Sequence, residues 1–469
     1  MPRNRESKTS SIDLYALAPE SVRDPPRDFK ERLRFLGPSL ILVGGIVGSG
    51  EIILTTSLGA LVGFSMLWFV LLSCWSKNII QSELARYSVS TGEPFLHAFN
   101  RLPGKILAFG GKRVSWYIYF WLLLIIPGVF LAGGGIYGGA GQVIHAAIPA
   151  IGSEWWTIGL AVLSSIIICT GSYKGIERLL TVMVISFTIV TLICAVLLQT
   201  TEYAITWDEV QGGLTFSFPV FAILVALGMY GATGVGTADQ IFYTYWCVEK
   251  GYARFTGPVN DSKDWVKRAR GWIKVMHLDV ILSLILLTFA TIPFYMLGAG
   301  ILHQLGQQPD GLETISVISS IYTRILGGWA FWLFMAGAFI VLFSTCISGL
   351  GGGARTFADG LAVLGLMERN DYTLRIQVLR GYAIVTPLVQ ALSYYIFQNP
   401  VWMLTVGMAI GVIQFPIIAA GTIYLRYKFL DQRIAPSRLT NIALWMSFFI
   451  MLGLAVWILY LSYPVKTTA

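Results

Sequence analysis

The sequence predicts an all-α integral membrane protein made of two inverted repeats of five transmembrane helices, followed by an eleventh helix. Three observations predict this fold class. First, 55% of the 469 residues are hydrophobic, 12% are charged and the mean hydropathy is +0.68, which excludes an ordinary soluble protein. Second, we count eleven apolar segments of membrane length. Third, glycines interrupt the first and the sixth segment, and five spans precede the second interruption.

The apolar segments give the span boundaries and the organisation of the chain. We place the spans at residues 38–62, 64–89, 116–143, 154–173, 177–200, 219–248, 275–301, 328–352, 381–397, 400–425 and 439–463. They divide the chain into a cytoplasmic N-terminal arm, a first repeat, an extracellular linker, a second repeat and the eleventh helix with the C-terminus, at 1–35, 36–200, 201–218, 219–425 and 426–469. The arm has no apolar h-region, so we do not expect a signal peptide.

The distribution of basic residues predicts the orientation. Thirty of the 33 Lys and Arg residues fall on the side of the membrane where this span count places the N-terminus. Because basic residues collect in cytoplasmic loops, we expect a cytoplasmic N-terminus and an external C-terminus. The compact loops favour the inner membrane of a bacterium. Basic loops beside anionic lipids also account for the net charge of +8, so we expect contact with the lipid bilayer and no nucleic-acid partner.

The residues most often used in enzymes and cofactor sites form no recognisable pattern. The five cysteines have neither disulfide nor metal-ligand spacing, and the four histidines lie in different segments. The sequence contains no Walker-type loop and no motif that pairs a nucleophile with a base. We therefore expect neither enzymatic activity nor a cofactor, and nothing in the sequence specifies an oligomeric state.

The first span is interrupted by flexible backbone and an acidic residue at 44–51, GGIVGSGE. At a helical rise of ~1.5 Å per residue from Pro38, Glu51 lies roughly 20 Å into a hydrocarbon layer ~30 Å thick. Acidic residues at such depth are candidates for a functional site. The alternative is that the Glu51 carboxylate caps the amides at the start of the following half-helix.

The sixth span repeats this feature with Gly228, Gly231, Gly234 and Gly236. Measured from Pro219, Gly231 is ~18 Å deep, so the two interruptions can meet near the bilayer midplane. Broken helices in corresponding positions of two repeats form the binding site of many secondary transporters. The sequence therefore predicts a transporter whose substrate, a small ion or small molecule, binds at the breaks.

Short patterns along most of the hydrophobic region resemble those of the NRAMP divalent-metal transporters. The matching segments are GSGE at 48–51, in frame with the family's Asp-Pro-Gly-Asn, QSELAR at 81–86, GIERL at 175–179, GAT at 231–233, ST and SG within 344–349, and QFP at 414–416. Each pattern is short, but their order and placement in the spans agree. The resemblance implies a LeuT-type fold that works by alternating access.

The resemblance also implies a substrate site that departs from the family pattern. Gly48 stands in the place of the family's metal-binding Asp, and Glu51 in the place of its Asn. Ala232 corresponds to the residue that offers a backbone carbonyl, and Val235 to a Met ligand. Because a thioether favours soft and borderline metals, its loss argues against a typical transition-metal transporter. The third span also lacks the acidic residues of proton-coupled members, which implies uncoupled transport or another coupling ion.

Three interpretations of this site remain open. Glu51 could be a metal ligand for a hard divalent cation such as Mg²⁺ or Ca²⁺. It could instead bind the ammonium group of a small organic solute, with nearby hydroxyls as hydrogen-bonding groups, or the protein could be a non-transporting sensor. The candidate substrate-binding residues are Gly48, Ser49, Glu51, Ala232, Thr233, Val235 and Thr237, with Asp239 and Thr55 as accessories.

Other polar and small residues in the spans have simpler explanations. We do not expect Lys77 or Glu83 near the substrate, and Glu83 with Arg86 is expected to form a pair on the helix surface. Asp279 is expected in an interfacial ion pair, and Asp239 could simply face water. The glycines at 133–141 of the third span favour close helix packing, with a widened cavity as the alternative.

Overall fold

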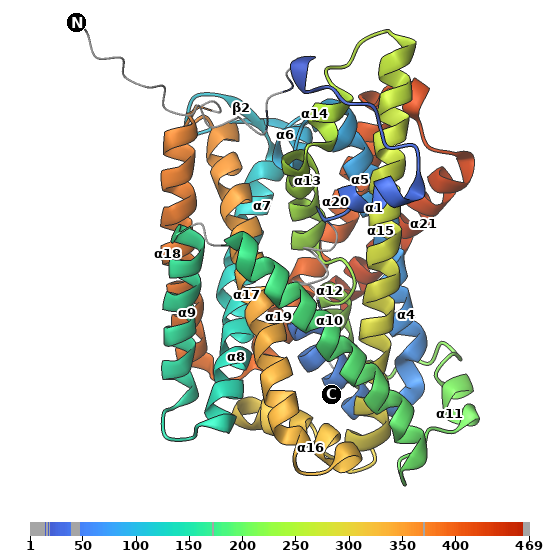
Figure 1. The fold of residues 1–469 in the computed structure, drawn as a ribbon, viewed down its shortest axis with the longest axis vertical. Helices are drawn as coiled ribbons and strands as arrows, with labels where there is room; N and C mark the ends of the chain where they lie inside the picture. The colour runs from blue at the N-terminus through green and yellow to red at the C-terminus, as the bar shows by residue number, and fades with distance from the viewer. Residues whose placement is uncertain are drawn as a thin grey trace, which may run out of the picture.

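The computed structural model describes residues 15, 17, 19–38, 47–170, 173–368 and 371–462. Residues 1–14, 16 and 18 of the predicted N-terminal arm, residues 39–46 of the first predicted span and the end of the chain after 462 lie outside the described residues. The protein is a bundle of helices with one short β-hairpin at an end of the bundle (Figure 1). In the hairpin, β1 (Lys105–Leu107) pairs antiparallel with β2 (Arg113–Ser115), with Ile106 opposite Val114.

The helices follow one another with short connections. In the first half they are η1 (Pro19–Ser21), α1 (Phe29–Phe35), η2 (Gly50–Thr55), α3 (Thr56–Val62), η3 (Gly63–Met66), α4 (Leu67–Ser76), α5 (Asn78–Thr91), α6 (Phe95–Phe99), α7 (Trp116–Pro127), η4 (Gly128–Gly133), α8 (Gly134–Ala147), α9 (Ser153–Thr170), α10 (Tyr173–Leu197), η5 (Leu198–Thr200) and α11 (Trp207–Gly212). In the second half they are η6 (Val220–Ala222), α12 (Ile223–Ala232), α13 (Thr237–Lys250), α14 (Tyr252–Thr256), α15 (Lys263–Leu297), η7 (Gly298–Leu302), η8 (Gly311–Glu313), α16 (Thr314–Leu326), α17 (Ala330–Val363), α18 (Tyr372–Phe397), α19 (Pro400–Val412), α20 (Gln414–Lys428), η9 (Gln432–Ile434) and α21 (Arg438–Ser462).

Eight helical segments of the described chain are long and apolar enough to cross a membrane. The first of them, Gly50–Thr91, contains parts of the first and second predicted spans. The two spans are separated at Gly63, where φ is +60°. Glycine is favoured in this left-handed region because it has no Cβ. The total of eleven spans stays a prediction, whereas a multi-pass, all-helical architecture agrees with the sequence.

Two long helices extend beyond the apolar segments that predicted them. Helix α15 begins at Lys263, whereas the predicted span begins near 275. The Ser262 hydroxyl caps the start of the helix by accepting a hydrogen bond from the Trp265 amide at 3.1 Å. Helix α17 continues to Val363 instead of ending near 352. Apolarity marks the part of a helix that suits a membrane, and these polar extensions have no such signal.

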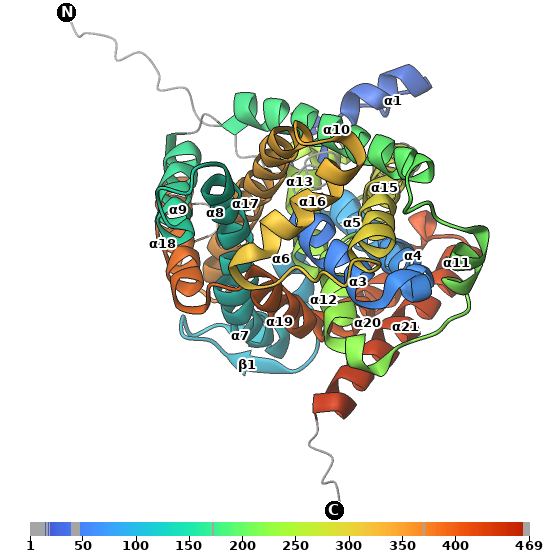
Figure 2. The same cartoon turned by 90° about the horizontal axis from the view of Figure 1, so that it is seen from below.

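Two further spans are not continuous α-helices. The third span changes from α7 to the π-helical turn η4 directly after Pro127, a residue that cannot donate the usual helical hydrogen bond. The tenth span divides into α19 and α20 at Ile413, a break that was not predicted. Seen along the bundle, α12, which ends at the break of the sixth span, lies near the centre, and α9 and α18 lie at the edge (Figure 2).

Glycine permits the first and seventh spans to pack backbone against backbone. A Cβ added to Gly298 would lie 2.4 Å from the Thr56 carbonyl oxygen, and one added to Gly59 would lie 2.6 Å from that of Tyr295. Neither oxygen can rotate away as a flexible side chain could. The contact between α3 and the α15–η7 region therefore requires glycine on both sides.

We expect Gly298→Ala to lower the free energy of unfolding by about 1–3 kcal/mol, because the new methyl group forces the two backbones apart. Gly159→Ala on α9 is the matched control, since a Cβ there meets no atom within 4 Å. Thermal unfolding of the detergent-solubilised proteins measures the difference. Equal melting temperatures for the two variants would contradict the close backbone contact.

Candidate functional site

The breaks of the first and sixth spans lie in direct contact. Helix α12 ends at Ala232 and α13 begins at Thr237, with the intervening chain turning at Gly234, where φ is +63°. A Cβ added to Gly50 would lie 2.9 Å from the Ala232 carbonyl oxygen. The two interruptions therefore meet, as the sequence predicted, and this junction is the candidate substrate site.

Glu51 lies fully buried at this junction, with 0% of its surface exposed. One carboxylate oxygen, Oε2, accepts a hydrogen bond from the Gly48 amide at 3.1 Å. The other, Oε1, accepts one from the Thr291 hydroxyl on α15 at 3.2 Å. The contact with Gly48 is the capping interaction that the alternative interpretation predicted. The contact with Thr291 adds a link between the first and seventh spans, so the carboxylate has a role wider than capping.

The predicted hydroxyl and accessory residues make contacts close to their own helix ends. The Thr55 hydroxyl donates to the Gly50 carbonyl at 3.0 Å, and the Thr233 hydroxyl lies 2.6 Å from that of Ser73. The Asp239 carboxylate accepts a hydrogen bond from the Gly236 amide at 3.1 Å and so caps α13. These contacts are structural ones. They do not by themselves bring the hydroxyls or Asp239 to Glu51.

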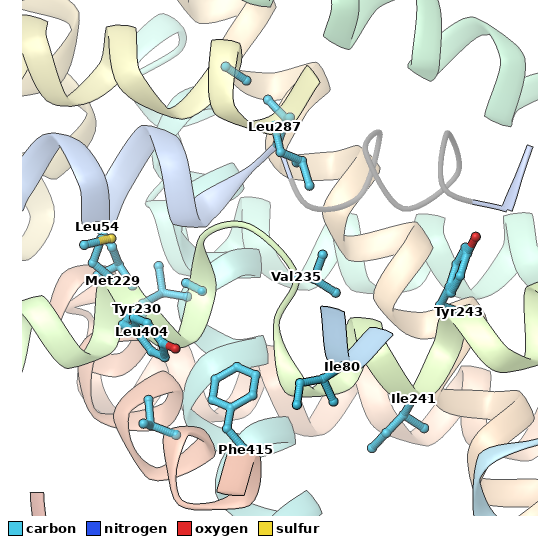
Figure 3. Packing of buried hydrophobic residues seen from close by; sticks show 14 of the residues in the cluster. Leu54, Ile80, Met229, Tyr230, Val235, Ile241, Tyr243, Leu287, Leu404 and Phe415 are labelled. Carbon is cyan, nitrogen blue, oxygen red and sulfur yellow. The ribbon is translucent and has the colours of Figure 1, made fainter. Parts of the chain in front are cut away.

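Val235 lies on the turn that joins α12 and α13, among the apolar side chains of the core (Figure 3). It is 1% exposed, and Ala232 and Ser49 are also buried. The part of the chain that the structure describes contains no group of three or more His, Cys, Asp or Glu side chains that could hold a metal ion. At this junction the oxygen atoms on hand are those of the Glu51 carboxylate and of the backbone carbonyls.

Lys77 belongs to the same region, although the sequence did not predict it there. It lies between α4 and α5 and is 0% exposed. Its Nζ donates hydrogen bonds to the carbonyls of Tyr230 and Thr233, at the break of the sixth span, and to the Ser73 hydroxyl at 3.3 Å. The signal that could have found it was a lone basic residue within an apolar span.

A cavity of about 210 Å³ borders the sixth-span break on the side of the third span. Gly128 and Gly133 of the third span line it, together with Gly231, Thr237 and Gln414. Further along the third span, the glycines pack tightly. A Cβ on Gly138 would lie 2.0 Å from the Tyr394 ring. The glycines of this helix thus both line a cavity and permit close packing, the two features predicted as alternatives.

Three other charged residues are more deeply buried than the sequence predicted, namely Glu83, Arg86 and Asp279. Glu83 and Arg86 form the predicted pair, at 3.0 Å, but the pair is buried in the bundle, and Arg86 also donates to the Ile434 carbonyl at 3.1 Å. Asp279 is buried, and it accepts hydrogen bonds from the Gly37 amide at 3.1 Å and the Tyr243 hydroxyl at 2.9 Å. Its interfacial ion pair stays a prediction. Arg86 and Asp279 each join separate parts of the chain, and spacing along one helix cannot reveal such contacts.

The junction of two broken helices and the short sequence patterns point to one family. The family model described as natural resistance-associated macrophage protein-like, Nramp, matches residues 39–461. The chain belongs to the Nramp family. Membership makes it a multi-pass membrane protein of a metal-ion transporter family, in agreement with the resemblance seen in the sequence.

Relatives and solved structures support the same fold. An uncharacterized protein of Pasteurella multocida is 24% identical over 407 residues, which cover 82% of this chain and 83% of that protein. The manganese transporter of Eremococcus coleocola superposes with a TM-score of 0.63 at 13% identity, over 93% of this chain and 88% of that one. Mhp1, a nucleobase-cation-symport-1 transporter in a closed conformation, superposes with a TM-score of 0.55 at 12% identity, over 97% and 98%. The LeuT-type fold predicted for the Nramp chain is confirmed.

Proposed function

We propose that this Nramp-family protein is a secondary transporter that moves a hard divalent cation, Mg²⁺ or Ca²⁺, by alternating access. In this proposal the cation binds where the breaks of the first and sixth spans meet, between the Glu51 carboxylate and the Ala232 carbonyl. One observation carries the proposal: Gly50 of the first span packs against the Ala232 carbonyl oxygen of the sixth span, and the next residue, Glu51, has a fully buried carboxylate. Intramembrane carboxylates commonly mark ion pathways.

The donor atoms at this junction favour hard cations. Carboxylate and carbonyl oxygens suit Mg²⁺ and Ca²⁺, and Mg²⁺ retains several of its own water molecules when it binds. Val235 occupies the position where the family resemblance implies a Met ligand, so no thioether is supplied there. The cation would take its place on Glu51 beside, or instead of, the hydrogen bonds from Gly48 and Thr291.

The setting of the transporter is part of the same proposal. We infer a cytoplasmic N-terminus and an external C-terminus in a bacterial inner membrane, from the distribution of basic residues. Residues 36–200 and 219–425 would form the two inverted repeats. Because the third span is without acidic residues from Trp116 to His145, its side chains offer no carboxylate for proton coupling.

Uptake into proteoliposomes tests the cation proposal. We expect flux of Mg²⁺ or Ca²⁺ into vesicles that contain the natural protein, and at least a tenfold loss with Glu51→Gln, because the neutral amide removes the charged oxygen ligand. Glu313→Gln, at an exposed position of η8, is the matched control and should transport normally. Folded Glu51→Gln protein with undiminished flux would contradict the role of the carboxylate.

The cavity beside the break supports a second candidate function. A volume of about 210 Å³ that Thr237 and Gln414 help to line could receive a small organic solute. In that case metal flux should be absent from sealed vesicles containing folded protein. Uptake of a small organic ammonium compound should then be insensitive to chelators, which distinguishes this candidate from the cation transporter.

A further inference from the structure

Lys77 is a charged side chain that the transport of a cation does not explain. Its surface is fully buried where α4 and α5 meet, within the segment that crosses the membrane. Lysine is almost never fully buried without partners, because its ammonium group loses its hydration. The groups that contact Lys77 therefore indicate which kind of chemical group this part of the protein can bind.

Oxygen atoms at the sixth-span break replace the water around the ammonium group. Lys77 Nζ donates to the carbonyl oxygens of Tyr230 and Thr233, and to the Ser73 hydroxyl at 3.3 Å. An ammonium group has three N–H donors, and three acceptors are present. The two carbonyls lie at the end of α12, where the break leaves them without an intrahelical donor.

Two aromatic rings complete the surroundings. Nζ lies 4.5 Å from the centroid of the Tyr230 ring and 5.2 Å from that of Phe415. The Tyr230 ring is fixed by the contact of its hydroxyl with Ser76, at 2.8 Å, and packs edge-on against Phe415. Ring faces attract cations at these distances, most strongly where water is excluded. Oxygens and rings together make a site shaped for a primary ammonium group.

Among the described residues, no carboxylate forms an ion pair with Lys77. All three of its hydrogen bonds go to uncharged oxygens. The ammonium group is therefore held by uncharged oxygens and aromatic rings.

We propose that the break of the sixth span contains a binding site for a primary ammonium group and that Lys77 occupies it as a tethered ligand. This site lies on the second-span side of the break, whereas the Ala232 carbonyl faces Gly50 of the first span. Lys77 thus donates to two carbonyls at the break, those of Tyr230 and Thr233, and the Ala232 carbonyl is left for the substrate. The proposal is independent of which substrate is transported.

A vacated site should accept a free primary amine. The full-length Lys77→Ala variant is solubilised and purified in propylammonium chloride or in tetramethylammonium chloride at the same concentration. Propylammonium can donate three hydrogen bonds and tetramethylammonium can donate none. We expect the amine to raise the melting temperature of Lys77→Ala by roughly 2–4 °C relative to tetramethylammonium, and to leave the natural protein unchanged, because its site is filled. Equal melting of Lys77→Ala in both salts would overturn the proposal.

A second variant decides the question if Lys77→Ala does not fold. Lys77→Met keeps an unbranched apolar stem of similar length but removes every N–H donor. We expect it to melt roughly 4–8 °C below the natural protein, because the Tyr230 and Thr233 carbonyls lose their donor. Lys274→Met, at an exposed position of α15, is the matched control and should melt normally. A Lys77→Met protein that melts like the natural one would show that only the stem matters and would overturn the proposal.

Discussion

Replacing Asp359 by alanine is expected to lower the free energy of unfolding by about 3–5 kcal/mol, because it leaves buried positive charge without its partner. Asp359 is 1% exposed near the end of α17. Its Oδ1 lies 3.0 Å from His97 Nε2 on α6 and 3.7 Å from Arg375 Nη1 on α18. Its Oδ2 accepts a hydrogen bond from the Tyr245 hydroxyl on α13 at 2.7 Å. One carboxylate therefore joins four helices.

Thermal or denaturant unfolding of the solubilised protein measures this loss. Asp208→Ala, an exposed acidic position in the first turn of α11, is the control, and we expect it to cost less than about 1 kcal/mol. The combined variant Asp359→Leu with Arg375→Leu removes both charges. It should recover part of the loss, since replacing a buried pair is less costly than breaking it. An Asp359→Ala protein as stable as the control would refute the four-helix link.

The helical membrane architecture could be predicted from sequence because a bilayer imposes strong constraints on composition. Segments that cross it must be apolar and must satisfy their backbone groups internally, so length and apolarity identify them. Length and apolarity did not detect helical segments that are polar or that are apolar on one face only. They did not reveal the polar first turns of α15, and they did not reveal α16, which carries its apolar residues on one face only.

The candidate site could be predicted in part because glycine marks breaks in a span. The positions of Gly50 and Gly231 were sufficient to predict that the two breaks meet. The partners of Lys77 and Asp359 could not be predicted, because hydrogen bonds between residues more than a hundred positions apart leave no trace in local spacing. In both cases the visible signal was only a charged residue in an apolar context, which identifies a candidate without identifying its partners.

Val235→Met should shift the ion preference of the transporter towards soft metals. Val235 stands where the family resemblance implies a Met, three residues after Ala232 and on the same break. A thioether is a soft ligand that discriminates for metals such as Cd²⁺ and against Mg²⁺ and Ca²⁺. We expect Cd²⁺ to inhibit Mg²⁺ or Ca²⁺ uptake at a roughly tenfold lower concentration than in the natural protein, which corresponds to about 1.4 kcal/mol of binding energy.

The comparison that isolates the sulfur is Val235→Leu. Leucine and methionine have similar volumes, and Val235 is buried, so both variants impose a similar packing change on the turn between α12 and α13. Only methionine adds a ligand. A shift in Cd²⁺ inhibition with methionine and not with leucine would place this side chain beside the transported ion. The same inhibition in both variants, with flux retained, would contradict the placement of residue 235 beside the transported ion.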